Sequence, residues 1–171
     1  DRRQRQMCIR DRHNSGTTSV DVRNWYFSNK ASKTLTFNAA SIVGFDANNA
    51  STYTIAPGDY MIIARNASTT FYVAISNDFM TLYDSSSGWV DEATWNSSSS
   101  GVSLEEDPSD PYNDWIPTSN PSPGSANTGG GGTGGPTYVQ SDVVINEVMA
   151  DPWPSYDNSS WPGGEWVELY N

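Results

Sequence analysis

Residues 143–149 read Val-Val-Ile-Asn-Glu-Val-Met, and residues 165–170 read Glu-Trp-Val-Glu-Leu-Tyr. Both runs are short and rich in β-branched or aromatic residues. The loop between them contains Pro152, Pro154 and Pro162. Apolar runs bounded by Pro and Gly are typical of β-strands. The sequence therefore predicts two strands near the C-terminal end of the chain.

Similar runs recur from residue 20 to residue 104, and no stretch shows a sustained helical period. Residues 60–64 are apolar throughout and predict a central strand. Residues 84–88 predict a hairpin loop between runs at 79–83 and 89–95. Further short runs lie at 20–27, 33–37, 52–55, 71–75 and 102–104. This recurrence predicts an all-β sandwich or barrel.

The apolar pattern is lost from residue 107 onward. Five prolines lie between residues 108 and 123 and are unfavourable for regular strand pairing. Residues 128–141 form a Gly-rich linker. We therefore divide the chain into an N-terminal segment at 1–13, a β-sandwich at 14–127, the linker at 128–141, and the two strands within 142–171.

The first twelve residues differ in composition from the rest. They hold five of the nine basic residues and the only cysteine, Cys8. The sequence Met-Cys-Ile-Arg-Asp-Arg at 7–12 resembles the translated end of a sequencing-library transposon. We interpret the segment as non-native; the alternative is a genuine basic arm. Because the chain also stops within an alternating run, we interpret it as a fragment of a longer protein.

The charge of the chain restricts its partners. With 20 acidic and 9 basic residues, the net charge is −11. Such an acidic chain does not attract nucleic acid through its general field. No apolar run is long enough to insert into a membrane as a helix. The abundance of Ser, Thr, Asn, Gly and aromatic residues favours an extracellular or cell-surface location.

Several motifs together resemble a lamin-tail domain. The two C-terminal runs resemble the opening of that family, which reads like I-x-E-V and then E-[FW]-V-E-L-x-N. Residues 20–27 resemble its VDLSGW strand, and residues 55–60 its LAPGGY turn. Residues 81–91 resemble its L-x-D hairpin. Residues 102–105 resemble its closing S-L-E-R, although Glu106 replaces the usual Arg.

The resemblance implies an immunoglobulin-like β-sandwich present as tandem partial copies. The first copy lacks its opening strands, and residues 142–171 contain the matching ones. An open sandwich edge exposes unpaired backbone groups. We therefore expect residues 142–171 to fold back onto residues 14–127 and complete the sandwich as a circular permutation. In prokaryotes the family resembles adhesive or scaffolding modules of exported multidomain proteins.

An acidic segment at residues 105–114 is the main candidate for a metal site. It concentrates carboxylates on a turn, and Ca²⁺ prefers such hard oxygen ligands. Its spacing does not match an EF-hand, and the alternative interpretation is a solvated exit from the domain. A second oxygen-rich loop lies at 151–157. No other cofactor is expected, and the candidate Ca²⁺ ligands are Glu105, Asp107, Asp110, Asn113 and Asp114.

The residues needed for nucleophilic catalysis are missing. His13 is the only histidine and lies beside the suspect N-terminal segment, which argues against a Ser-His-Asp triad. The glycines at 129–135 lack the lysine of a phosphate-binding loop. Glu147 and Glu168 could form a carboxylate pair for glycoside cleavage, but we favour outward-facing strand positions. We predict that the chain is not an enzyme.

Seven tryptophans suggest a binding role. Trp89, Trp95, Trp115, Trp153 and Trp161 lie near predicted strand ends or loops, where rings can stack on sugars or partners. The alternative places Trp25, Trp95 and Trp166 in the core. We expect a non-catalytic structural or interaction module of a secreted or cell-surface multidomain protein. Its expected partners are a protein or surface glycan and neighbouring domains of the parent chain. The alternatives are a Ca²⁺- or carbohydrate-binding module and an accessory domain of an extracellular hydrolase.

Overall fold

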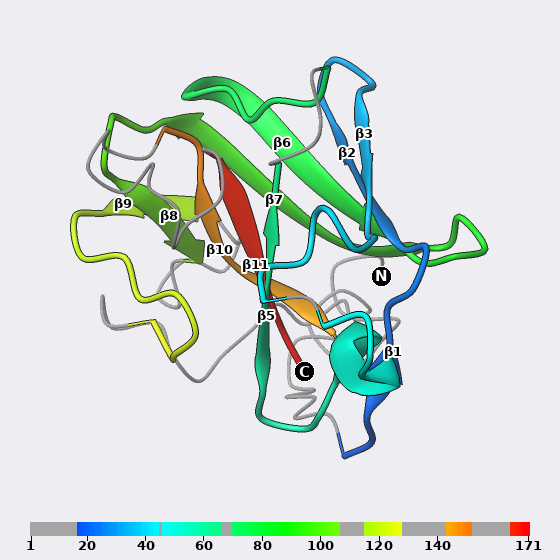
Figure 1. Cartoon of the computed structure of the whole chain (residues 1–171). Helices are drawn as coiled ribbons and strands as arrows, with labels where there is room; N and C mark the ends of the chain where they lie inside the picture. The colour runs from blue at the N-terminus through cyan, green and yellow to red at the C-terminus, as the bar shows by residue number, and fades with distance from the viewer. Residues whose placement is uncertain (1–16, 45, 66–69, 107–114, 128–142, 152–164) are drawn as a thin grey trace, which may run out of the picture.

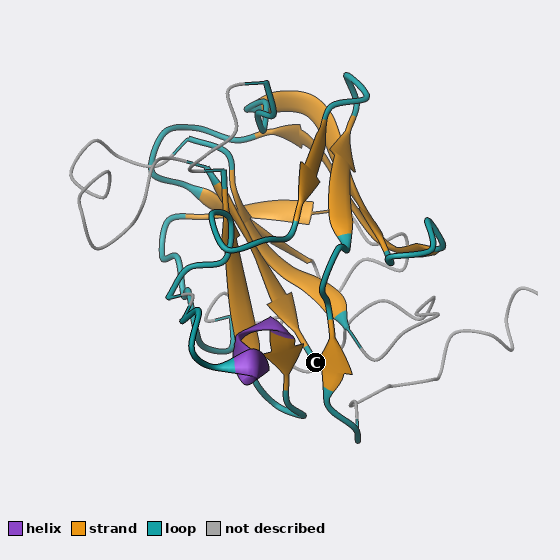
Figure 2. Cartoon of the chain, turned by 45° about the vertical axis from the view of Figure 1, so that its right-hand side comes forward, coloured by secondary structure: helices purple, strands orange, loops and turns teal. Residues whose placement is uncertain are grey.

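The structure is a computed structural model that describes residues 17–44, 46–65, 70–106, 115–127, 143–151 and 165–171. Among these residues the fold is an all-β sandwich of two antiparallel sheets, as the sequence predicts (Figure 1). The helical turn in Figure 2 is η1, a 3₁₀ helix at Ala50–Tyr53. No helix of the described residues is long and apolar enough to cross a membrane.

The larger sheet has the strand order β5-β11-β10-β8-β9, and the smaller has the order β3-β2-β6-β7. A separate two-stranded ribbon pairs β1 with β4. The large-sheet strands are β5 (Tyr60–Ala64), β8 (Ser103–Glu106), β9 (Trp115–Thr118), β10 (Val144–Met149) and β11 (Trp166–Tyr170). The others are β1 (Val20–Asp21), β2 (Tyr26–Asn29), β3 (Thr34–Thr36), β4 (Thr54–Ile55), β6 (Ser76–Tyr83) and β7 (Trp89–Ser97).

The two C-terminal strands lie in the middle of the large sheet (Figure 1). Strand β11 pairs with β5 from Trp166↔Ala64 to Tyr170↔Tyr60. On the other side of the hairpin, β10 pairs with β8. Both neighbours precede the Gly-rich linker in the sequence. The prediction that the C-terminal segment folds back onto the body is therefore confirmed for its described residues. Without β10 and β11, both β5 and β8 would present an open edge.

One hydrophobic core fills the space between the sheets. The small sheet contributes side chains such as Phe27 and Leu82, and the hairpin contributes Ile145, Val148 and Leu169. All five are buried. Burying one such side chain stabilises a fold by about 1.5–3 kcal/mol. The hairpin is therefore part of the core as well as of the sheet.

An inter-sheet hydrogen bond adds a polar connection to this core. The pairing of β10 with β11 shifts between Ile145 and Glu147. The backbone N–H of Ile145 donates to Oδ2 of Asp91, on β7 of the small sheet, at 2.8 Å. Burial raises the pKa of Asp91 to about 6, while hydrogen bonds from the backbones of Ile145 and Glu92 act in the opposite direction.

Some predicted strands differ from those observed. The run at 20–27 is divided into β1 and β2, because Asn24 adopts a positive φ of 64° between them. The run at 52–55 begins as η1 and only ends as β4. Residues 71–75 are not a strand, although Phe71 and Val73 are buried. In this segment, apolar residues at alternate positions indicated that their side chains are buried, but they did not indicate strand pairing.

Two edge strands account for the remaining differences. The bounds of β5 agree with the prediction, but β5 lies at the edge of its sheet rather than at its centre. Ile42 bridges to Ile63 and covers part of this edge. Strand β9 was not predicted, because it contains Pro117. Proline is tolerated there because β9 is the opposite edge of the sheet.

Candidate functional site

The predicted Ca²⁺ ligands are only partly covered by the structure. Asp107, Asp110, Asn113 and Asp114 lie outside the described residues, as does most of the loop at 151–157. Glu105 lies on β8 and is buried. Among the residues that are described, no group of three or more His, Cys, Asp or Glu could hold a metal ion. The Ca²⁺ hypothesis remains a prediction.

Glu105 belongs instead to a row of three glutamates across the large sheet. The strand register places Glu147 opposite Glu105 on one side and opposite Glu168 on the other. Directly opposed residues of antiparallel strands have Cβ atoms about 4.5–5.5 Å apart. The three carboxyl groups therefore extend from the same face of neighbouring strands. We call this set the glutamate row.

The glutamate row is buried although it faces away from the core. Val148, Val167 and Leu169 point into the sandwich, so the alternating glutamates point outward. Glu147 and Glu168 nevertheless have no solvent-accessible surface. Their predicted interpretation as ordinary outward-facing strand positions was therefore incomplete. The missing factor is a loop at 121–127 that covers this part of the sheet.

Hydrogen bonds from the loop and from neighbouring strands satisfy these carboxyl groups. The backbone N–H of Ser122 donates to Oε2 of Glu147 at 3.1 Å, and the Ser103 hydroxyl donates to Oε1. The backbone N–H of Gly124 donates to Glu168, whose other oxygen accepts a bond from Asn146 Nδ2 at 2.7 Å. These oxygens thus hold the loop on the sheet.

Burial and mutual proximity raise the pKa values of two members of the row, Glu147 and Glu168. Loss of hydration raises the pKa of Glu168 to about 7, and the nearby charge of Glu147 adds to the effect. Desolvation likewise raises the pKa of Glu147, and the charge of Glu105 acts in the same direction. The donated hydrogen bonds lower both values in part. The site therefore favours protonated carboxyl groups more than open solvent does.

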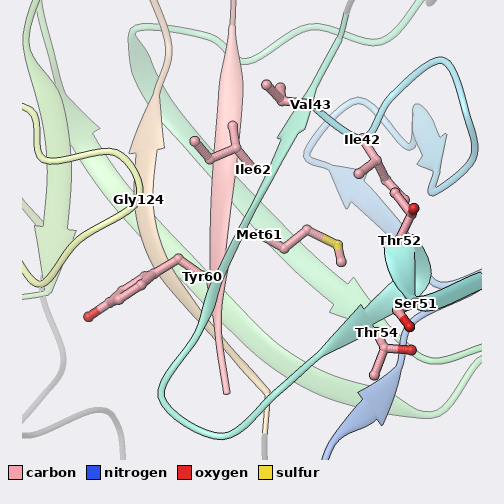
Figure 3. A pocket seen from close by; sticks show the side chains of 9 residues that line it. All are labelled: Ile42, Val43, Ser51, Thr52, Thr54, Tyr60, Met61, Ile62 and Gly124. Atoms are coloured by element: carbon pink, nitrogen blue, oxygen red, sulfur yellow. The ribbon is translucent and has the colours of Figure 1, made fainter. Parts of the chain in front are cut away.

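A hollow of about 250 Å³ lies next to this region, at the free side of β5 (Figure 3). Figure 3 shows Tyr60 and Met61 projecting to opposite sides of the strand. Desolvation raises the pKa of Tyr60, and the neighbouring Tyr170 and Glu168 contribute further. The lining combines apolar side chains with hydroxyl-bearing ones: Ile42, Val43, Ser51, Thr52, Thr54, Tyr60, Met61, Ile62 and Gly124. Among the described residues, none of those that line the hollow carries a carboxylate.

The outer face of the small sheet carries aromatic side chains where the outer face of the large sheet carries the glutamate row. The register aligns Tyr26 of β2 with Tyr83 of β6, and Tyr83 with Trp89 of β7. The rings of Tyr26 and Tyr83 are stacked, with centroids 5.0 Å apart and planes inclined by 15°. Trp89 is 37% exposed, and it is one of three exposed large hydrophobic residues among those described. Aromatic side chains therefore form one line across three strands.

Polar residues form the next line on the same face. Ser28 is aligned with Thr81, and Thr81 with Glu92. The Thr81 hydroxyl donates to Oε2 of Glu92 at 2.8 Å. Thr81 is buried and Ser28 half-buried, whereas Glu92 and four further outward positions are solvent-exposed: Thr34, Thr36, Thr94 and Asn96. We call the outer face of β3-β2-β6-β7 the open face, and the outer face of the large sheet the closed face.

The tryptophans are divided between core and surface. Trp25 and Trp95 are buried in the core between the sheets, as the core interpretation predicts. Trp166 is buried too, but it packs with Ala64 and Met149 on the closed face. Trp115 is buried as well, because it lies on the unpredicted strand β9. Trp153 and Trp161 lie outside the described residues. Trp89 is therefore the described tryptophan that is available to a partner.

The line Tyr26–Tyr83–Trp89 could not be recognised from the sequence alone. Position 89 enters the line because the β6–β7 register shifts between Leu82 and Tyr83, so that Leu82 faces Asp91 while Tyr83 faces Trp89. Such a bulge changes which residues share a face.

Comparisons with known proteins give no further information. The chain matches no protein-family model, no curated protein and no solved structure.

Proposed function

We propose that this chain is a non-catalytic interaction module of a secreted or cell-surface multidomain protein, similar to a lamin-tail domain. The observation that carries the proposal is the open face, with Trp89 exposed beside the stacked pair Tyr26 and Tyr83. Tyrosine and tryptophan provide large contact areas at low conformational cost, and they are enriched in binding surfaces. A partner protein is the first candidate ligand.

The hydrogen bonding of the glutamate row supports a structural role for the closed face. The oxygens of Glu147 and Glu168 accept bonds from Ser103, Ser122, Gly124 and Asn146. A general acid or nucleophile has to reach its substrate. These two buried groups instead connect the loop at 121–127 to the sheet. The acidic chain, with a net charge of −11, also favours a partner that is neutral or basic.

A neutral glycan is the second candidate ligand. The open face has a line of aromatic residues next to the exposed Glu92, whose carboxylate also accepts a hydrogen bond from the buried Thr81. Sugars are bound by CH groups packing on aromatic rings together with hydrogen bonds to hydroxyl and carboxyl groups. The same face therefore suits a polysaccharide chain, with the edges and hydroxyl groups of the tyrosine pair beside Trp89.

A binding comparison tests both candidates. The full chain and the variants Trp89→Ala and Tyr72→Ala are exposed to a displayed random-peptide library and to immobilised cellulose, xylan and chitin. Tyr72 is the matched control, because it is exposed to a similar extent but lies outside the small sheet. We expect at least tenfold weaker binding for Trp89→Ala only. Selected peptides would support a protein partner, and retained polysaccharide a glycan. Absence of binding to every probe would count against the proposal.

A further inference from the structure

The β10–β11 hairpin and the strands that receive it suggest an interaction between copies of the chain. We propose that the slot between β5 and β8 also accepts the β10–β11 hairpin of a second copy, so that copies of this chain associate by exchanging hairpins. This inference concerns a different surface from the open face and goes beyond the proposed function.

The backbone pairing provides the first argument. Five residue pairs join β11 to β5, and three join β10 to β8. Both receiving strands belong to the part of the chain that precedes the linker. The hairpin therefore occupies a position with an antiparallel partner on each side. Such edges pair with a matching strand whichever molecule supplies it.

Side-chain contacts make the slot specific for this hairpin. Asp91 accepts the backbone N–H of Ile145 at 2.8 Å, and Arg65 forms an ion pair with Glu165 at 2.7 Å. The Nδ2 group of Asn171 donates to the backbone oxygens of Ile55, at 2.5 Å, and of Thr18, at 2.9 Å. Ser122 and Gly124 bind the two glutamates of the hairpin. Every one of these contacts joins the hairpin to the body without a covalent bond.

The linker between the body and the hairpin favours binding within one copy but does not exclude the hairpin of another copy. Residues 128–142 lie between the last described residue of the body and the hairpin, and six of them are glycine. Covalent tethering through a short linker gives the attached segment an effective concentration in the millimolar range. A hairpin of the same copy is therefore favoured in dilute solution. Exchange becomes competitive when copies are concentrated or held close together, which is the usual condition for domain swapping.

The first test separates the hairpin from the body after folding. A protease site replaces residues 129–135 of the full chain, the folded protein is cleaved, and a fluorescent peptide of residues 142–171 is added. We expect the cleaved hairpin to remain bound and the peptide to replace it slowly. A Leu169→Asp peptide should be incorporated at least tenfold less, because Leu169 is fully buried. Failure of the unmodified peptide to enter would overturn the proposal.

The second test uses intact chains. Two full-length preparations with different tags are mixed at about 10 µM and about 1 mM, taken through a mild denaturant and returned to buffer. Co-purification of both tags, rising with concentration, is expected. Its absence at both concentrations would refute exchange between copies. Trp89→Ala should exchange normally, so a failure of the open face as a binding site would be distinguishable from a failure of hairpin exchange.

Discussion

The two outer faces of the sandwich use polar and aromatic residues in opposite ways. On the closed face, Glu147, Glu168 and Trp166 are buried beneath other parts of the chain. On the open face, Glu92 and Trp89 occupy similar outward strand positions but remain exposed. Residue type alone therefore does not determine a role in this protein. The presence or absence of a covering segment decides whether a side chain stabilises the fold or is available to a partner.

The two tryptophans should show the largest difference between the faces. Trp166 packs with Ala64 and Met149 on the closed face. We expect Trp166→Ala to lower the free energy of unfolding by about 3–5 kcal/mol, as is usual for a buried aromatic residue. Trp89→Ala should cost less than about 1 kcal/mol, because its side chain is already partly hydrated. Urea unfolding measures both, and equal losses would contradict the distinction.

The closed face should also make stability depend on pH. The pKa of Glu168 is raised from 4.5 to about 7, so the folded protein holds this proton more tightly than the unfolded chain. The contribution is complete below about pH 4.5 and is lost as the pH rises through about 7. Asp91, raised from 3.8 to about 6, acts in the same direction. For Glu168 alone the decrease should be roughly 3 kcal/mol.

Urea unfolding at pH 4.5 and pH 7.5 measures this effect. Glu168→Gln resembles the protonated side chain and should flatten the pH dependence, because its amide does not ionise. The remaining slope should reflect Asp91 and Glu147, whose pKa values are raised as well. An unchanged slope in the Glu168→Gln variant would show that folding does not raise the pKa of this carboxyl group.

Removing the central carboxyl group of the row should have a somewhat smaller effect. Glu147→Ala leaves the backbone N–H of Ser122 and the hydroxyl of Ser103 without their acceptor. Unsatisfied buried donors cost about 1–3 kcal/mol each, and partial rehydration of the loop offsets part of this, so we expect a loss of about 2–3 kcal/mol. Thr94→Ala is the control on the open face and should change stability by less than about 0.5 kcal/mol. Comparable losses of stability in the two variants would contradict the proposed difference between the closed and open faces.

The smallest effect should come from the end of the covering loop. Asn127 donates to the backbone oxygen of Asn146 at 2.9 Å and accepts from its Nδ2 group at 3.0 Å. Asn127→Ala should lower stability by about 1 kcal/mol and speed amide hydrogen exchange at Ser122 and Gly124. Exchange at Tyr83 should not change. Equal acceleration on both sheets would indicate a global effect instead of local opening of the loop.

The sequence predicted the sheet elements better than the covering segments. Residues 60–64 and the β10–β11 hairpin were recognisable because their patterns are local. The burial of Glu168 was not predictable, since it depends on the loop at 121–127, which contains Pro, Ser and Gly and has no apolar pattern. Long-range contacts of such a loop leave no periodic signal.

The aromatic line of the open face was missed for a different reason. Tyr26, Tyr83 and Trp89 are separated in sequence and come together only through the pairing of three strands. A shift of one residue in that pairing would move Trp89 to the other face. The prediction of a metal site at residues 105–114 rested on acidic residues that are close together in the sequence. In the structure, Glu105 is instead aligned with glutamates about 40 and 60 positions away, through strand register.

The contacts of Asn171 have a mechanical consequence. Its side chain binds the backbone of Thr18, and its backbone pairs with Asp59 and Gly58. Tension applied between Thr18 and Asn171 would therefore load a few hydrogen bonds at one end of the sandwich before it reached the strands. Those bonds can break and re-form one by one. The module would yield locally at low force while its core remained folded, and so act as a small elastic element under tension.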